Sequence, residues 1–132
     1  MLVRSSTVNF EIGAEKIWAA LEGQRCLEKN KILKTTQLNE NEFYAGIGWL
    51  ARENKIFEED EVHYGLGATN LTSEIGTNAG RVWRVMDIWG EVNISTIRQL
   101  ADMGEKEACS ALGWLAKEGK IYINKKQMYN LK

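Results

Sequence analysis

The sequence lacks several features that would place a protein in a function class at once. Among its 132 residues there is no proline, one histidine and two cysteines, Cys26 and Cys109. Two cysteines make neither a disulfide framework nor a metal-binding cluster, so we predict no metal site and a reduced, cytoplasmic protein. No stretch approaches the roughly 18 apolar residues of a membrane span, and the first residues lack the apolar core of a signal peptide. We therefore expect no contact with a membrane.

The residues also give little support to catalysis. His63 has no cysteine or carboxylate pair at metal-ligand spacing, and Cys109 has no second histidine to activate its thiol. No glycine-rich phosphate loop follows a strand pattern. With 44% apolar residues, 27% charged residues and a net charge of −1, the composition is that of a globular protein. We predict a protein that is not an enzyme and needs no cofactor.

The chain is a tandem repeat. Residues 48–56 (GWLARENKI) reappear as residues 113–121 (GWLAKEGKI), with seven of nine positions identical at an offset of 65. The same offset aligns Ile17-Trp18 with Val82-Trp83, and we expect Trp18 and Trp83 to pack in the core or between units. The predicted units are residues 1–66 and residues 71–132, joined by the short linker 67–70. Units of this size have marginal cores, so the two units should pack together or the protein should oligomerise.

The sequence pattern of each unit predicts a helix, a short strand, two more helices and a β-hairpin. In the second unit a helical stripe ends at Gly90, Ser95 can cap the next helix, and Ile97 and Leu100 should point inward. The third helix should end at Gly119, whose counterpart is Asn54, because glycine and asparagine best tolerate the left-handed helix stop. The residues expected on the buried side of the first and third helices are Ala79, Val82, Met86, Trp89, Ala108, Leu112 and Leu115.

Three helices followed by a two-stranded wing form a winged helix-turn-helix unit, so we predict an α+β fold of two such units in tandem. Residues 74–83 (EIGTNAGRVW) and 111–121 (ALGWLAKEGKI) resemble a family of small prokaryotic winged helix-turn-helix proteins of unknown function. The first unit keeps residues 48–56 and a shortened Glu11-Ile-Gly13 start, but lacks the Thr-Asn-Ala-Gly segment. The resemblance implies the fold and a duplicated family domain; it implies no activity, since the label of DNA binding rests on fold analogy.

The third helices are poorly equipped to read bases. With Phe43, Ile47 and Leu50 inward, the outward face of the first one carries small residues at its middle turns, and base readout needs long donors there. Small residues instead permit another helix to approach closely, and aromatic residues beside them are typical of protein interfaces. The predicted protein interface therefore consists of Ala45, Gly48, Trp49, Ser110, Gly113 and Trp114. For the two tryptophans, folding over the edge of their own core and stacking on bases remain open alternatives.

The two predicted units differ in net charge. Residues 1–66 have 8 basic and 11 acidic side chains, a net of −3, while residues 67–132 have 9 and 7, a net of +2. The acidic wing, residues 58–61, would repel phosphate, so only the second unit is suited to nucleic acid. Such contacts should be weak, salt-sensitive and carried by Lys106, Lys117, Lys125 and Lys126.

The first functional hypothesis is a regulatory or adaptor module that acts through protein contacts, including self-association, on the tryptophan-bearing third helices. The alternative is a DNA-associated regulator that touches the DNA backbone weakly with its second unit. A small-molecule sensor in the crevice between the units is a third, weaker hypothesis, because the sequence offers no polar constellation for it.

Overall fold

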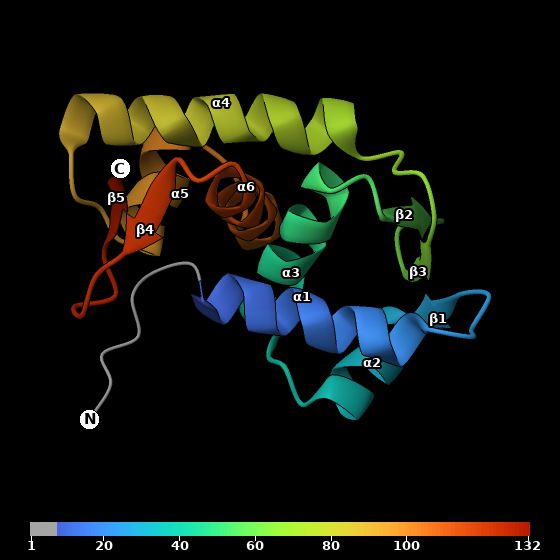
Figure 1. Cartoon of the computed structure of the whole chain (residues 1–132). Helices are drawn as coiled ribbons and strands as arrows, with labels where there is room; N and C mark the ends of the chain where they lie inside the picture. The colour runs from blue at the N-terminus through green and yellow to red at the C-terminus, as the bar shows by residue number, and fades with distance from the viewer. Residues whose placement is uncertain (1–7) are drawn as a thin grey trace.

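The computed structural model describes residues 8–132. The first unit has three helices and a small sheet, in the predicted order (Figure 1). Its strands form an antiparallel sheet of order β1-β3-β2, in which Leu27 pairs with Tyr64 and Ile56 with Leu66. The elements are α1 (Val8–Leu21), β1 (Leu27–Glu28), α2 (Lys29–Thr36), α3 (Glu40–Arg52), β2 (Ile56–Glu59) and β3 (His63–Leu66).

The second unit repeats this order with one strand reduced to a single bridge. Val92, at the place of β1, pairs only with Tyr129 of the hairpin. The chain passes from the end of β3 to the next helix within a few residues, which agrees with a short connection. The elements are α4 (Thr72–Trp89), α5 (Ile94–Ala101), α6 (Glu105–Lys117), β4 (Ile121–Ile123) and β5 (Tyr129–Leu131).

The helix ends follow from local side-chain chemistry. Asn54 and Gly119 take the left-handed conformation after α3 and α6, with φ of 61° and 73°, which confirms the predicted helix stops. Asn39 opens α3 with a capping box, accepting a hydrogen bond from the Glu42 backbone N–H at 2.8 Å. The predicted cap at Ser95 is wrong: Asn93 caps α5 instead, because its carboxamide oxygen accepts the Thr96 N–H at 2.8 Å.

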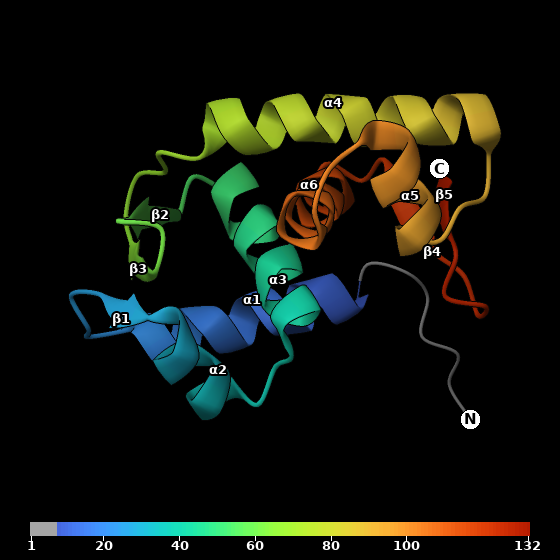
Figure 2. The ribbon, with the colours of Figure 1, turned by 180° about the vertical axis from the view of Figure 1, so that it is seen from behind.

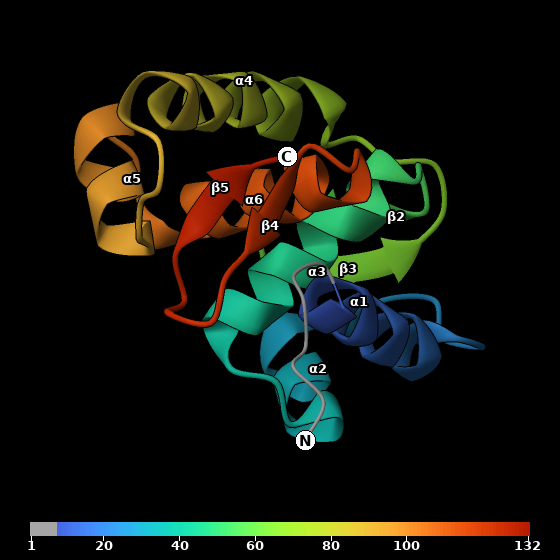
Figure 3. The same cartoon turned by 60° about the vertical axis from the view of Figure 1, so that its left-hand side comes forward.

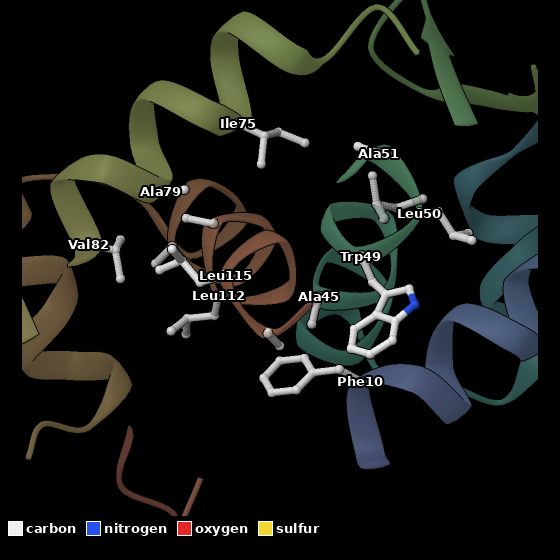
Figure 4. Packing of buried hydrophobic residues seen from close by; sticks show 14 of the residues in the cluster. Phe10, Ala45, Trp49, Leu50, Ala51, Ile75, Ala79, Val82, Leu112 and Leu115 are labelled. Carbon is white, nitrogen blue, oxygen red and sulfur yellow. The ribbon is translucent and has the colours of Figure 1, made fainter. Parts of the chain in front are cut away.

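Each unit buries the predicted faces of its first and third helices. In the second unit Ala79 and Val82 of α4 face Leu112 and Leu115 of α6, and all four are buried (Figure 4). Three predictions of burial are wrong. Trp89, Leu100 and Trp83 are 62%, 44% and 38% exposed. Trp89 is the last residue of α4, beyond the buried Val85 and Met86.

The third helices of both units lie at the centre of the molecule. Figure 1 shows α4 lying across α3 and α6 on one side, α1 and α2 on the other, and the two wings at opposite ends. The view from behind and the view turned by 60° show the same arrangement (Figures 2 and 3). The contact between α3 and α6 is the most extensive between any two described elements. Within residues 8–132, no helix is both long and apolar enough to cross a bilayer.

Candidate interaction surfaces

The faces that carry Ala45, Gly48, Ser110 and Gly113 lie against each other inside one chain. A Cβ atom added to Gly48 would overlap the main-chain oxygen of Ser110, and one added to Gly113 would overlap that of Ala45. The 65-residue offset relates Gly48 to Gly113 and Ala45 to Ser110, so the two contacts are equivalent. The helices α3 and α6 therefore cross about a pseudo-two-fold axis. The small residues therefore let the backbones of α3 and α6 approach closely. The sequence analysis expected these residues to accommodate a close helix, and here that helix belongs to the same chain.

Charged residues close the crossing at the carboxyl ends of both helices. Arg52 pairs with Glu118 at 3.1 Å, and Lys117 pairs with Glu53 at 3.2 Å. These two ion pairs are again equivalent under the offset. Each links one unit to the other. Because their basic side chains are half-exposed, each pair contributes little by itself.

The two tryptophans fold over their own units and are covered by the other one. Trp49 is 9% exposed and lies beside Phe10 and Ala45 (Figure 4). Trp114 is half-buried, and a Cβ on Gly76 of its own α4 would sit 3.5 Å from the indole ring. The Nζ atom of Lys117 lies 5.2 Å from the Trp49 ring centroid. The equivalent distance, from the Arg52 guanidinium carbon to the Trp114 ring, is 5.6 Å. Neither indole projects as a free stacking platform.

One flank of the crossing is filled by polar and aromatic side chains, which we call the filled flank: Lys29, Tyr44, Glu58, Tyr64 and Lys106. The carboxylate of Glu58 accepts a hydrogen bond from the buried Tyr64 hydroxyl at 3.1 Å and one from Lys106 Nζ at 3.5 Å. Lys106 and Lys29 lie 5.7 and 5.5 Å from the centroid of the Tyr44 ring. Burial and the Glu58 carboxylate raise the pKa of Tyr64 above its usual value. Lys106 thus ties the second unit to the wing of the first.

The four lysines proposed for nucleic acid fall into two groups. Lys106 and Lys117 form the inter-unit ion pairs with Glu58 and Glu53. Lys125 and Lys126 are exposed in the turn between β4 and β5. The structure does not bring the four into one stripe directed outward, because α6 presents its face to α3.

A groove lined partly by exposed apolar side chains lies between α4 and α5, and we call it the α4–α5 groove. It contains the exposed side chains Ile88, Trp89 and Leu100, of which Ile88 is 67% exposed. Arg81 and Arg84 also line it, and the Arg81 guanidinium donates a hydrogen bond to the Ala101 carbonyl oxygen. Exposed apolar side chains gathered in one place, with charges beside them, are typical of interaction sites.

Sequence reasoning missed this groove because it assigned Trp89 and Leu100 to the core. A comparison of the two units contains the missing signal. Under the 65-residue offset Ile88 replaces Gly23 and Trp89 replaces Gln24. The second unit therefore has large apolar residues at positions where the helix of the first unit has already ended. Because the first unit forms its core without such residues, they are not needed for the core of the fold and indicate another role.

The sequence also drew attention to two reactive side chains, those of Cys109 and His63. Burial raises the pKa of the Cys109 thiol to about 12, so the thiol stays protonated near neutral pH. His63 lies in the exposed first wing and forms an ion pair with Asp60 at 2.9 Å, which raises the pKa of the imidazole. No cluster of three or more metal-ligating side chains is present in residues 8–132.

The comparison with known families identifies the repeat. The model of a winged helix-turn-helix domain (DUF2582) matches residues 9–64 and again residues 70–131. The chain belongs to this family. Both the fold class and the tandem duplication of a DUF2582 domain are thereby confirmed, and winged-helix domains in general are binding modules. The predicted boundaries 1–66, 67–70 and 71–132 stay predictions.

One comparison with solved structures gives a match over most of the chain. The matching structure is described as "Structure of the mRNA-binding domain of elongation factor SelB from E.coli in complex with SECIS RNA". It is 16% identical, the match covers 91% of this chain and 97% of that one, and the TM-score is 0.40. No curated protein matches the chain.

Proposed function

We propose that this DUF2582 protein is a non-enzymatic binding module of regulatory or adaptor type, which acts through protein contacts rather than by reading bases. One observation carries the proposal: α3 and α6, the helices that a DNA-reading winged helix would insert into the major groove, bury each other. We further propose that Ala45, Gly48, Ser110 and Gly113 serve this internal interface, and that partners bind elsewhere.

The α4–α5 groove is the surface that best suits a partner. It offers a tryptophan, which is enriched among the residues that dominate binding energies, together with two arginines that favour an acidic partner. The first wing of the same chain carries such a segment. Glu59, at the end of β2, and Asp60 and Glu61, which follow it, are exposed next to Val62, which is 44% exposed; we call residues 59–62 the acidic turn.

We therefore propose a second copy of the chain as the occupant, with its acidic turn in the groove. Because two different surfaces meet, the contact is heterologous. Every oligomer keeps one free groove at one end and one free turn at the other, so association continues as the chain concentration rises. A turn of four residues buries little area, so the contact should be weak and should be screened by salt.

Sedimentation equilibrium over a range of chain concentrations tests this. We expect the mean mass to rise with concentration at low salt and to fall back when salt is added. Trp89→Ser and Glu61→Lys should each give monomers. A mixture of these two variants should form one-to-one dimers and nothing larger, because the first keeps its turn and the second keeps its groove.

Lys126→Glu is the matched control, since it also changes a surface charge but lies in the second wing, and it should associate like the parent chain. A monomer at every concentration would contradict self-association, as would oligomers that both variants leave intact. A salt-sensitive shift of duplex DNA that Lys125→Glu with Lys126→Glu abolishes would favour the nucleic-acid alternative instead.

A further inference from the structure

A cleft lies between the two units on the flank of the α3–α6 crossing opposite the filled flank. Its volume is about 180 Å³. Phe10 and Ala45 contribute from the first unit, and Cys109, Ile123 and Tyr129 contribute from the second. For comparison, an engineered protein cavity of about 150 Å³ lined by apolar side chains holds a benzene molecule. The cleft is therefore large enough for one small ring.

The repeat explains why this flank is hollow. Under the 65-residue offset, Cys109 occupies the position that Tyr44 has in the first unit, and Asn41 occupies the position of Lys106. Ile123 likewise stands where the filled flank has Glu58. The filled flank is thus the pseudo-symmetric counterpart of the cleft. There the Tyr44 ring lies below the Nζ atom of Lys106, which bonds to Glu58. Replacing that ring by a thiol leaves a space that no residue of the second unit fills in the described chain.

The lining of the cleft suits an uncharged occupant. No lysine or arginine lines it among the described residues, and its one carboxylate, that of Glu42, accepts the Asn39 N–H at 2.9 Å within the α3 capping box. Burial raises the pKa of Tyr129 to about 12, as it does for Cys109, so both groups are neutral at physiological pH. The side-chain amide of Asn41 also lines the cleft and can bond to a hydroxyl or ring N–H group.

We propose that this cleft is a binding site for a small neutral aromatic molecule of phenol or indole size, whose ring takes the place that the Tyr44 ring has on the filled flank. The site does not involve the α4–α5 groove. It stands whether or not the chain self-associates, and it requires both units, because α1 and α3 form one wall while α6 and the second wing form the other.

Titration of the isotope-labelled full chain with phenol and with indole, followed by NMR, tests the proposal. We expect saturable shifts confined to the backbone amides around Phe10, Ala45 and Cys109, with a Kd on the order of 1 mM or tighter, which so small a ligand can reach. Benzoate and tyramine, which carry a charge on a similar ring, should bind at least about tenfold more weakly.

Cys109→Tyr should abolish the saturable shifts because it recreates the filled flank. If the tyrosine variant does not fold, Cys109→Met serves as the second test. It fills the same space with a flexible side chain and should weaken binding at least about tenfold. Cys26→Ala, which removes the other thiol, is the control and should bind like the parent chain. The absence of saturable shifts with either probe would overturn the proposal. So would binding that a folded Cys109→Tyr or Cys109→Met variant leaves unchanged.

Discussion

The two flanks of the α3–α6 crossing began as the same surface and have become opposites. On one, Glu58 joins Tyr64 and Lys106 in a network that connects the units; on the other, Ile123 and Cys109 leave a cleft. A pseudo-two-fold interface makes this possible, because every contact on one flank has a counterpart that can change independently. The difference shows that two equivalent flanks can differ, one being filled by side chains of the chain itself and the other containing a cleft.

The crossing itself is the part that the two units share, and it should be the most sensitive to substitution. Gly113→Ala places a Cβ on the Ala45 carbonyl oxygen and should lower the free energy of unfolding by about 3 kcal/mol, the upper range for overpacking. Gly48→Ala should do the same from the other side. The measurement is urea unfolding followed by circular dichroism.

Gly80→Ala is the matched control for the crossing. Gly80 lies within α4, and a Cβ added there meets nothing within 4 Å. The substitution should therefore raise the free energy of unfolding by about 0.5–1 kcal/mol through helix propensity. If Gly113→Ala behaved like Gly80→Ala, then α6 could not be packed against α3.

A smaller effect should separate the two flanks. Tyr64→Phe removes the hydroxyl that donates to Glu58 and should cost about 1 kcal/mol, since it leaves a largely buried carboxylate with one partner fewer. Tyr129→Phe is the equivalent change beside the cleft. In the described residues no side-chain hydrogen bond acts on the Tyr129 hydroxyl, so the free energy of unfolding of this variant should be within about 0.5 kcal/mol of the parent value. Equal losses in the two variants would show that the flanks do not differ.

The smallest effect should be a loss of stability in alkali that involves the cleft. Burial raises the pKa of the Cys109 thiol in the folded chain to about 12, from an ordinary value of 9.0. Above pH 9 the thiol ionises more readily in the unfolded chain than in the folded chain, which favours unfolding. The contribution of the protonated Cys109 thiol to the free energy of unfolding is therefore complete below pH 9 and is lost as the pH rises toward 12. The free energy of unfolding, measured between pH 8 and about pH 9.5, below the usual pKa of tyrosine, should decline less steeply with pH for Cys109→Ala than for the parent chain. Identical slopes would mean that the thiol is accessible to water.

Much of the fold could be predicted from the sequence, because the informative residues act locally. The repeat, the helix stops at Asn54 and Gly119, and the inward faces of α3 and α6 depend on residues within one unit. The cap was misplaced by two residues because Asn93 and Ser95 can both accept a backbone N–H group, and the turn geometry decides between them.

The candidate surfaces were harder to predict, because a helical pattern indicates which residues share a face but not what lies opposite. Gly48 and Gly113 were recognised as suited to a close helix, yet nothing in either segment specifies that this helix is the other copy. Trp89 extends an apolar stripe by one more turn, and only the position of α5 determines that its indole faces solvent.

The central claim is that α3 and α6 bury each other within one chain, and NMR distance contacts test it most directly. In a mixture of isotope-labelled and unlabelled chains, we predict strong cross-peaks between protons of Gly113 and Ala45, and between Gly48 and Ser110, that arise within a labelled molecule. Cross-peaks between labelled and unlabelled chains alone, or no cross-peaks and rapid exchange of the α6 amides, would contradict the account.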